Sequence, residues 1–179
     1  HIDFNNADWS NIHQLINDID STTVTIVHLG DSHLQADIAT SHTRKLLQNK
    51  YGDAGRGLII PFKMANTNEP RDYKITSSNT WTASTLMRQP WLCPMGFTGI
   101  SLSPCSQSAD LTISTCSRTH KQTFQSVRLF KKGDIAINQV NTSKCDSCQI
   151  YYENDYVDLL FSDTTSCINL NLECTKSVS

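Results

Sequence analysis

The sequence lacks several features that would assign it to a functional class at once. Its formal net charge is -2 and its basic residues are scattered, which argues against a nucleic-acid-binding surface. No apolar run approaches the roughly 20 residues of a membrane-spanning helix, and one of the longest, residues 58–60, ends at Pro61. No signal peptide is present and the first residue is His1, so we expect that a native segment has been removed.

Cysteine is missing from the first 92 residues and frequent afterwards. The total of seven is odd, which leaves at least one thiol unpaired or paired outside the chain. Zinc binding or redox chemistry at Cys145-x-x-Cys148 is disfavoured, because no second ligand pair follows and no βαβ pattern surrounds the motif. We therefore expect no metal and no cofactor. Two roles for the cysteines remain: they are small buried residues, or they form the disulfides of an exported protein. We favour export, to the periplasm or the cell surface.

The first fifty residues resemble the opening of an α/β domain. Residues 8–19 carry apolar side chains at three- and four-residue steps, which predicts a helix with one apolar face that Asp8 can cap. Residues 23–29, TVTIVHL, are apolar and β-branched, which predicts a buried strand. Residues 34–51 predict a second helix, with Gly52 as its stop signal.

The periodicity changes near residue 62, where we place a boundary between domains 1–62 and 63–179. Beyond it, apolar and polar residues alternate in short stretches separated by polar turns, which predicts an antiparallel β-sandwich. Residues 127–130 and 135–137 flank Lys-Lys-Gly-Asp and predict a hairpin. The predicted fold class is α+β: a short helix–strand–helix segment followed by an antiparallel β-sandwich.

Gly30-Asp31-Ser32-His33 lies between the predicted strand and the second helix. A serine at such a break can be a nucleophile, because its side chain projects from the carboxyl end of the sheet and the free N–H groups of the helix can stabilise an oxyanion. Gly30 permits the turn and the approach of a substrate. Ser32 and Gln35 also form an S-x-x-Q capping box, so the serine can equally be a helix cap.

A longer stretch resembles the SGNH (GDSL-like) hydrolases. TIVHLGDSHLQAD, followed by TRKLLQNKYGDAGRGLIIP and TNEPRDYKITSSNTWTAST, looks most like the envelope-associated branch with GDSH as its first motif and a β-rich, carbohydrate-binding-like domain inserted soon after it. Peptidoglycan O-acetylesterases belong to that type. The resemblance covers the first hundred residues. It implies that Ser32 is the nucleophile, that the Ser32 N–H is an oxyanion donor, and that Asp31 orders the turn.

The later blocks of that family are missing. The sequence has no G-x-N-D, whose asparagine is an oxyanion donor, and no D-x-x-H, which supplies the base. We therefore expect the N-terminal part of an esterase for O-acetylated carbohydrate, inactive alone, whose partner is the rest of the hydrolase domain or a second chain. The alternative is a non-catalytic module that binds a glycan or another protein.

Exposed aromatic side chains are the candidates for stacking on sugars. Trp81, Tyr151 and Tyr152 are the residues that we single out. Trp81 is expected more often in the core of a small sandwich than on its surface. The two tyrosines precede the polar run Glu-Asn-Asp, which favours an exposed position.

Overall fold

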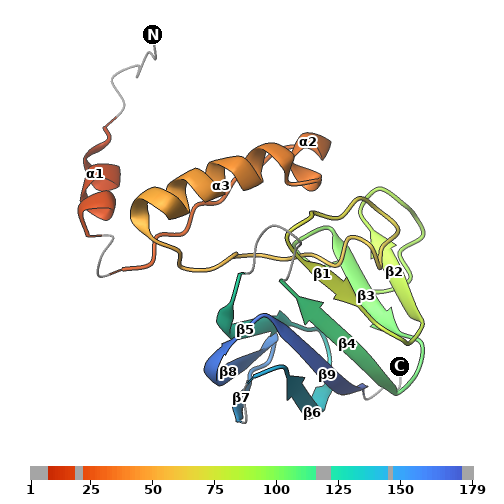
Figure 1. Cartoon of the computed structure of the whole chain (residues 1–179). Helices are drawn as coiled ribbons and strands as arrows, with labels where there is room; N and C mark the ends of the chain where they lie inside the picture. The colour runs from red at the N-terminus through yellow and green to blue at the C-terminus, as the bar shows by residue number, and fades with distance from the viewer. Residues whose placement is uncertain (1–7, 19–21, 116–121, 145–146, 175–179) are drawn as a thin grey trace. The chain divides into compact units, whose positions relative to one another are not determined.

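The computed structural model describes residues 8–18, 22–115, 122–144 and 147–174 (Figure 1). The chain divides into two compact units, His1–Ala54 and Gly55–Ser179, at a point N-terminal to the boundary predicted near residue 62. The described helices lie in the first unit and the described strands in the second. The fold is α+β and mostly β, with antiparallel sheets, as the sequence predicted.

The first unit contains three helices among its described residues: α1 (Ser10–Asn17), α2 (Ser32–Gln35) and α3 (Ile38–Tyr51). Helix α1 confirms the first predicted helix. The Asp8 carboxylate accepts a hydrogen bond of 2.9 Å from the Ser10 N–H, and this bond lowers the pKa of Asp8. The acid therefore satisfies one of the free N–H groups at the start of the helix.

The second predicted helix is divided, so a continuous helix over residues 34–51 is wrong. Asp37 lies between α2 and α3 with a φ of 55°, in the left-handed region. A residue in that region cannot continue a right-handed helix. Helix α3 ends as predicted, because Gly52 follows it with a φ of 97°.

The strand predicted over residues 23–29 is also wrong. Residues 23–30 run as irregular backbone and form no hydrogen bond with any residue that the structure describes. Most of their apolar side chains are open to solvent: Ile26 is 67% exposed, Val27 74% and Leu29 86%. A strand exists only where a neighbour pairs with it, and the described part of the chain gives this stretch no neighbour.

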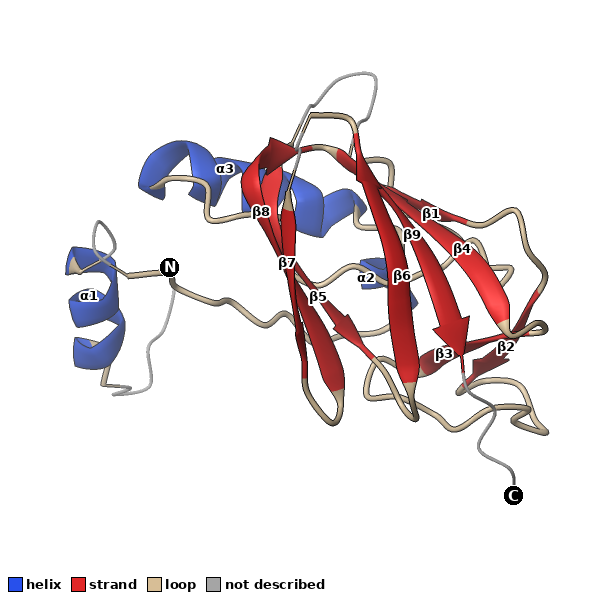
Figure 2. Ribbon diagram, turned by 90° about the horizontal axis from the view of Figure 1, so that it is seen from below, coloured by secondary structure: helices blue, strands red, loops and turns tan. Residues whose placement is uncertain are grey.

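The second unit consists of antiparallel strands in three sheets. The two larger sheets have the strand orders β1-β4-β9-β6 and β5-β8-β7, and the smallest is the pair β2-β3 (Figure 2). The strands are β1 (Lys74–Thr76), β2 (Trp81–Thr85), β3 (Ile100–Pro104), β4 (Ser108–Ser114), β5 (Phe124–Phe130), β6 (Ile135–Thr142), β7 (Cys148–Tyr152), β8 (Tyr156–Thr165) and β9 (Cys167–Cys174).

The two larger sheets share one apolar core, to which the central strands β8 and β9 contribute most. Alternate residues of each strand point inward, because successive side chains of a strand face opposite sides. On β8 and β9 these inward residues are between 0% and 4% exposed: Val157, Leu159, Phe161, Ile168, Leu170 and Leu172. This unit therefore has the buried apolar surface from which a domain gains its stability.

The hairpin predicted across residues 127–137 is wrong, because its two strands belong to different sheets. Strand β5 pairs with β8, whereas β6 pairs with β9. Lys131 turns toward the β7–β8 connection: its N–H donates to the Asp155 carbonyl at 2.8 Å, and its Nζ donates to the Asn154 carbonyl at 2.9 Å. The chain at this turn therefore passes from one sheet to the other instead of folding back beside itself.

Asp110 on β4 attaches the loop between β1 and β2 to the first sheet. Its carboxylate accepts hydrogen bonds from the Ser78 N–H at 2.9 Å, from the Ser78 hydroxyl, and from the Ser77 hydroxyl at 3.4 Å. Its own N–H donates to the side-chain oxygen of Asn79 at 2.7 Å. The Ser78 hydroxyl is the main reason that the pKa of Asp110 lies below its usual value of 3.8.

We expect Asp110→Asn to lower the free energy of unfolding of the second unit by about 1 kcal/mol at neutral pH, since hydrogen bonds to a charged acceptor become hydrogen bonds to an amide. Because the pKa is lowered by folding, this contribution is complete above the unfolded pKa and is lost as the pH falls through the folded pKa. Urea unfolding should therefore show the two proteins converging below about pH 4. A difference that does not change with pH would exclude the carboxylate as its cause.

Candidate functional site

The Gly30-Asp31-Ser32 turn lies where the irregular stretch of residues 23–30 meets α2. Ser32 is the first residue of that short helix, and the side chains of Ser32 and His33 are not among those that the structure describes. The Asp31 carbonyl accepts the Leu34 N–H at 3.0 Å. A Cβ at Gly30 would lie 2.5 Å from Cδ1 of Leu34, so the position accepts only glycine unless the leucine moves.

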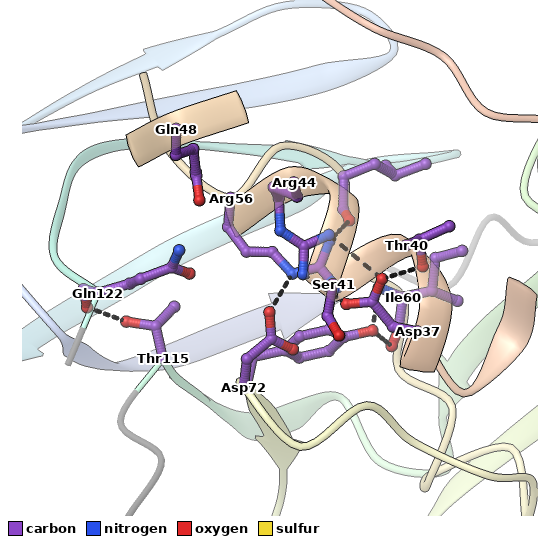
Figure 3. Close-up of polar contacts among 12 residues, drawn as sticks. Asp37, Thr40, Ser41, Arg44, Gln48, Arg56, Ile60, Asp72, Thr115 and Gln122 are labelled. Atoms are coloured by element: carbon purple, nitrogen blue, oxygen red, sulfur yellow. Dashed lines mark hydrogen bonds and ion pairs between the residues drawn. The ribbon is translucent and has the colours of Figure 1, made fainter. Parts of the chain in front are cut away.

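The junction after this turn is held by a buried carboxylate that the sequence analysis missed. Asp37 is 7% exposed and is the one buried residue among those of the first unit whose burial is described. It accepts a hydrogen bond from the Thr40 hydroxyl and two from the Arg44 guanidinium, at 2.5 Å and 3.2 Å (Figure 3). Such a two-point pair fixes position as well as charge, so Asp37 sets how α2 continues into α3.

A signal for this pair was present in the sequence. Asp37, Thr40 and Arg44 stand three and seven residues apart, and these steps place all three on one side of the start of α3. The helix was predicted from the spacing of its apolar residues, and none of these three residues is apolar. Asp37 therefore positions the junction between α2 and α3.

No described histidine is paired in the manner of a catalytic base. His13 lies in α1, His28 in the irregular stretch of residues 23–30 and His42 in α3, and none has a hydrogen bond or ion pair to a carboxylate of the described chain. A catalytic histidine normally has such a partner to fix its tautomer and orientation. Nor do the described residues contain a group of three or more side chains that could hold a metal ion.

The second motif of the family resemblance has a structural explanation. Arg56, within GDAGRGL, donates from Nε to the Asp72 carboxylate at 2.9 Å (Figure 3). Its guanidinium lies 5.0 Å from the ring centre of Tyr73. The Tyr73 hydroxyl in turn donates to the Ile60 carbonyl at 2.9 Å and accepts the Ile60 N–H at 3.1 Å. These contacts join the glycine-rich turn and the TNEPRDY segment at the start of the second unit.

The three aromatic residues predicted to bind a glycan lie in different environments. Trp81 on β2 is partly buried against the core, and its Nε1 donates to the Ser77 hydroxyl at 2.8 Å. Tyr151 and Tyr152 are each 50% exposed and follow one another on β7, an edge strand, so they point to opposite faces. The structure therefore does not gather the three residues into one surface.

The two tyrosines also differ in what their hydroxyl groups do. The Tyr152 hydroxyl accepts the Ile137 N–H at 2.9 Å and so links β7 to β6 of the other sheet. The Tyr151 hydroxyl donates to the side-chain oxygen of Gln149 at 2.9 Å, on the same face of the same strand. Tyr151 is therefore open to a ligand on the outside of the sheet, while Tyr152 helps to hold the two sheets together.

The described cysteines form no disulfide with one another. Cys93 is buried, and its thiol donates a hydrogen bond of 3.2 Å to the Ser84 hydroxyl oxygen. Burial raises the pKa of the Cys174 thiol, which makes its reactive thiolate scarcer. Two further cysteines, at 116 and 145, lie outside the described residues, so the prediction of export stays a prediction. None of the helices in the described ranges combines the length and the apolar character needed to cross a membrane.

Comparison with known proteins adds no relative. A scan against models of protein families finds no match, and searches of curated proteins and of solved structures find none either. The resemblance to SGNH hydrolases therefore depends on the residues of this chain alone.

Proposed function

We propose that this chain carries the nucleophile segment of an SGNH-type serine esterase that removes acetyl groups from carbohydrate. Ser32 is the nucleophile, and its backbone N–H is one of the oxyanion donors. The observation that carries the proposal is the sequence Gly30-Asp31-Ser32 at a turn between an apolar, β-branched stretch and the first residue of a helix. Such a turn presents a hydroxyl beside free N–H groups, as acyl transfer requires.

The surroundings of the turn support a place within a larger sheet. Residues 23–29 have the composition of a buried strand, yet Val27 and Leu29 are 74% and 86% exposed. No described residue pairs with their backbone groups, which can pair with parallel strands supplied by other polypeptide. In that position Ser32 would lie at the carboxyl end of a strand, where the loops of an α/β sheet form a cleft.

The base and the second oxyanion donor are proposed to come from outside these 179 residues. A serine hydroxyl is a weak nucleophile until a base accepts its proton, and the sequence contains neither D-x-x-H nor G-x-N-D. Loss of a triad residue costs on the order of 10⁴ to 10⁶ in rate. An enzyme for an envelope glycan must also reach its substrate, so we place it in the periplasm or at the cell surface.

We expect this chain and its Ser32→Ala variant to hydrolyse 4-nitrophenyl acetate at indistinguishable rates, because a nucleophile without a base gives no measurable acceleration. The measurement is the release of 4-nitrophenol, with a fluorophosphonate as a probe of serine reactivity. Faster hydrolysis by the unchanged chain would mean that a base exists within it or across a dimer. The proposal that the base comes from elsewhere would then be wrong.

A longer product of the same gene separates the esterase from its alternative. If it contains G-x-N-D and D-x-x-H blocks, it should release acetate from an acetylated xylan, and Ser32→Ala should reduce that rate at least a thousandfold, on the order expected for a triad nucleophile. Ser32→Cys offers a matched variant that retains a nucleophile. Activity that survives Ser32→Ala would overturn the assignment of the nucleophile.

The second candidate function is a non-catalytic glycan-binding module in which Ser32 only caps α2. It is favoured by the S-x-x-Q box and by the half-exposed Tyr151 on the outside of a sheet. Glycan binding that is unaffected by Ser32→Ala, with no esterase activity in any longer product, would favour this function.

A further inference from the structure

The sheet β5-β8-β7 has one apolar face and one face open to solvent. Val157 and Leu159 of β8 point into the core and are 0% exposed, while Tyr156, Asp158 and Leu160 alternate with them and point outward. Neither the core nor the other described sheets need the outward side chains for their packing. We call this surface the outer face and define it by the six residues Phe97, Arg128, Phe130, Tyr151, Tyr156 and Asp158.

One end of the outer face is aromatic. Phe130 on β5 stands directly opposite Tyr156 on β8, and their ring centres are 6.4 Å apart. Phe97, from the connection between β2 and β3, meets Phe130 edge to face at 5.0 Å. Phe97 is 71% exposed and Phe130 52%, which is costly for apolar rings that have no ligand.

The next row of the outer face is polar and carries no net charge. Arg128 on β5 stands opposite Asp158 on β8, and the guanidinium donates two hydrogen bonds of 2.7 Å to the carboxylate. The Arg128 guanidinium also lies 4.0 Å from the ring centre of Tyr156. Tyr151 stands opposite Asp158 on its other side. The pair lowers the pKa of Asp158, so both groups stay ionised at neutral pH.

We propose that the outer face binds a neutral polysaccharide of β-linked pyranoses. Such sugars have flat faces of C–H groups, which stack on aromatic rings, and a rim of hydroxyl groups, which bond to planar charged side chains. The aromatic and polar rows are about 6.6 Å apart, two residues along each strand, so one chain of sugars can contact both. That the ligand is a carbohydrate rests on the proposed function. That the binding site is the outer face rests on the residues of this sheet.

The charges near the outer face give no preference for acidic glycans. The Arg128–Asp158 pair is neutral, and the two turns that flank Phe130 and Tyr156 carry both signs of charge: Lys131, Lys132 and Asp134 in one turn, Glu153 and Asp155 in the other. The outer face therefore offers an anionic sugar no excess of positive charge that would attract it. A row of rings along the open face of a sheet also suits an extended polymer better than a small molecule, which prefers a concave site.

The test is the binding of hexasaccharides of β-1,4-linked glucose, xylose and N-acetylglucosamine to the whole chain, measured by isothermal titration calorimetry. We expect at least one of them to bind, and Phe130→Ala and Tyr151→Ala each to weaken that binding about tenfold, the loss of one stacking contact. The matched control is Tyr152→Ala, which removes the same side chain at the next residue, on the opposite face. Thermal melts followed by circular dichroism show whether each variant is folded.

The outcomes separate this inference from the esterase. No binding of any hexasaccharide, or binding lost with Tyr152→Ala and kept with Tyr151→Ala, would overturn the outer face as the glycan site. Arg128→Gln supplies a further variant, should Phe130→Ala fail to fold, and it should also weaken binding. Since none of these variants touches Ser32, glycan binding and Ser32-dependent hydrolysis can fail independently.

Discussion

Leu159→Ala is expected to lower the free energy of unfolding of the second unit by about 3 to 5 kcal/mol. Leu159 is 0% exposed and lies on β8, the central strand of its sheet, between Val127 of β5 and Ile150 of β7. Truncation leaves a cavity bordered by two strands on one side and by the other sheet on the other, so neighbours can refill it only partly. A loss of this size is a large share of the stability of a small domain.

Leu160→Ala is the matched control, because the same substitution is made one residue along the same strand. Leu160 points away from the core and is 43% exposed, so truncation of its side chain should cost less than about 1 kcal/mol. Urea unfolding followed by circular dichroism gives both values, and an unchanged slope shows that the unfolded states are comparable. Similar costs for the two substitutions would contradict the assignment of the inward and outward faces of β8.

The same alternation explains why the core could be predicted. Ile168, Leu170 and Leu172 alternate with polar residues in the sequence, and all three are buried on β9. Alternation of apolar and polar residues divides a strand into two faces, and the apolar face is the one that is buried in the core. The antiparallel, β-rich character of the second unit was therefore readable from the sequence.

Strand pairing was not readable in the same way. The Lys-Lys-Gly-Asp turn suits a hairpin between β5 and β6, but Lys131 binds carbonyl groups of Asn154 and Asp155, 23 or more residues away. Alternation and turn residues are local properties, whereas the sheet that a strand joins is decided by contacts distant in sequence. Asp37 was not predicted either, because the spacing of Asp37, Thr40 and Arg44 indicates a shared side of a helix but does not indicate that the carboxylate is buried.

The role of Ser32 stays a prediction, but the local structure around it can be compared. Local residue types predicted that a helix follows Gly30, and α2 is present there, although the helix predicted over residues 34–51 is divided at Asp37. The strand predicted before the turn is absent, because a strand needs a pairing partner as well as a suitable composition. Residues 23–29 are β-branched and apolar, yet no described segment pairs with them, and composition alone cannot supply a partner.

Produced alone, residues 1–54 are expected to show no cooperative unfolding, whereas residues 55–179 alone should melt within about 2 °C of the second unit in the whole chain. The first unit has no buried apolar residue among those whose burial is described, and Trp9, Leu15, Val27 and Leu46 are between 42% and 74% exposed. The second unit has its own core, with Leu159 and Leu170 at 0%. Circular dichroism during heating measures both fragments.

The expected behaviour of the first unit follows from what its helices cannot supply. Helix α1 has 8 residues and α3 has 14, and isolated helices of such lengths are marginal in water. The Asp37–Arg44 pair fixes one junction, but a pair of charges does not replace the burial of apolar area that offsets chain entropy. A sharp melting transition for residues 1–54 would show that the exposed apolar side chains pack together in solution. Residues 23–29, which pair with no described segment, would then need no sheet from outside, and the main support for the nucleophile segment as part of a larger hydrolase would be lost.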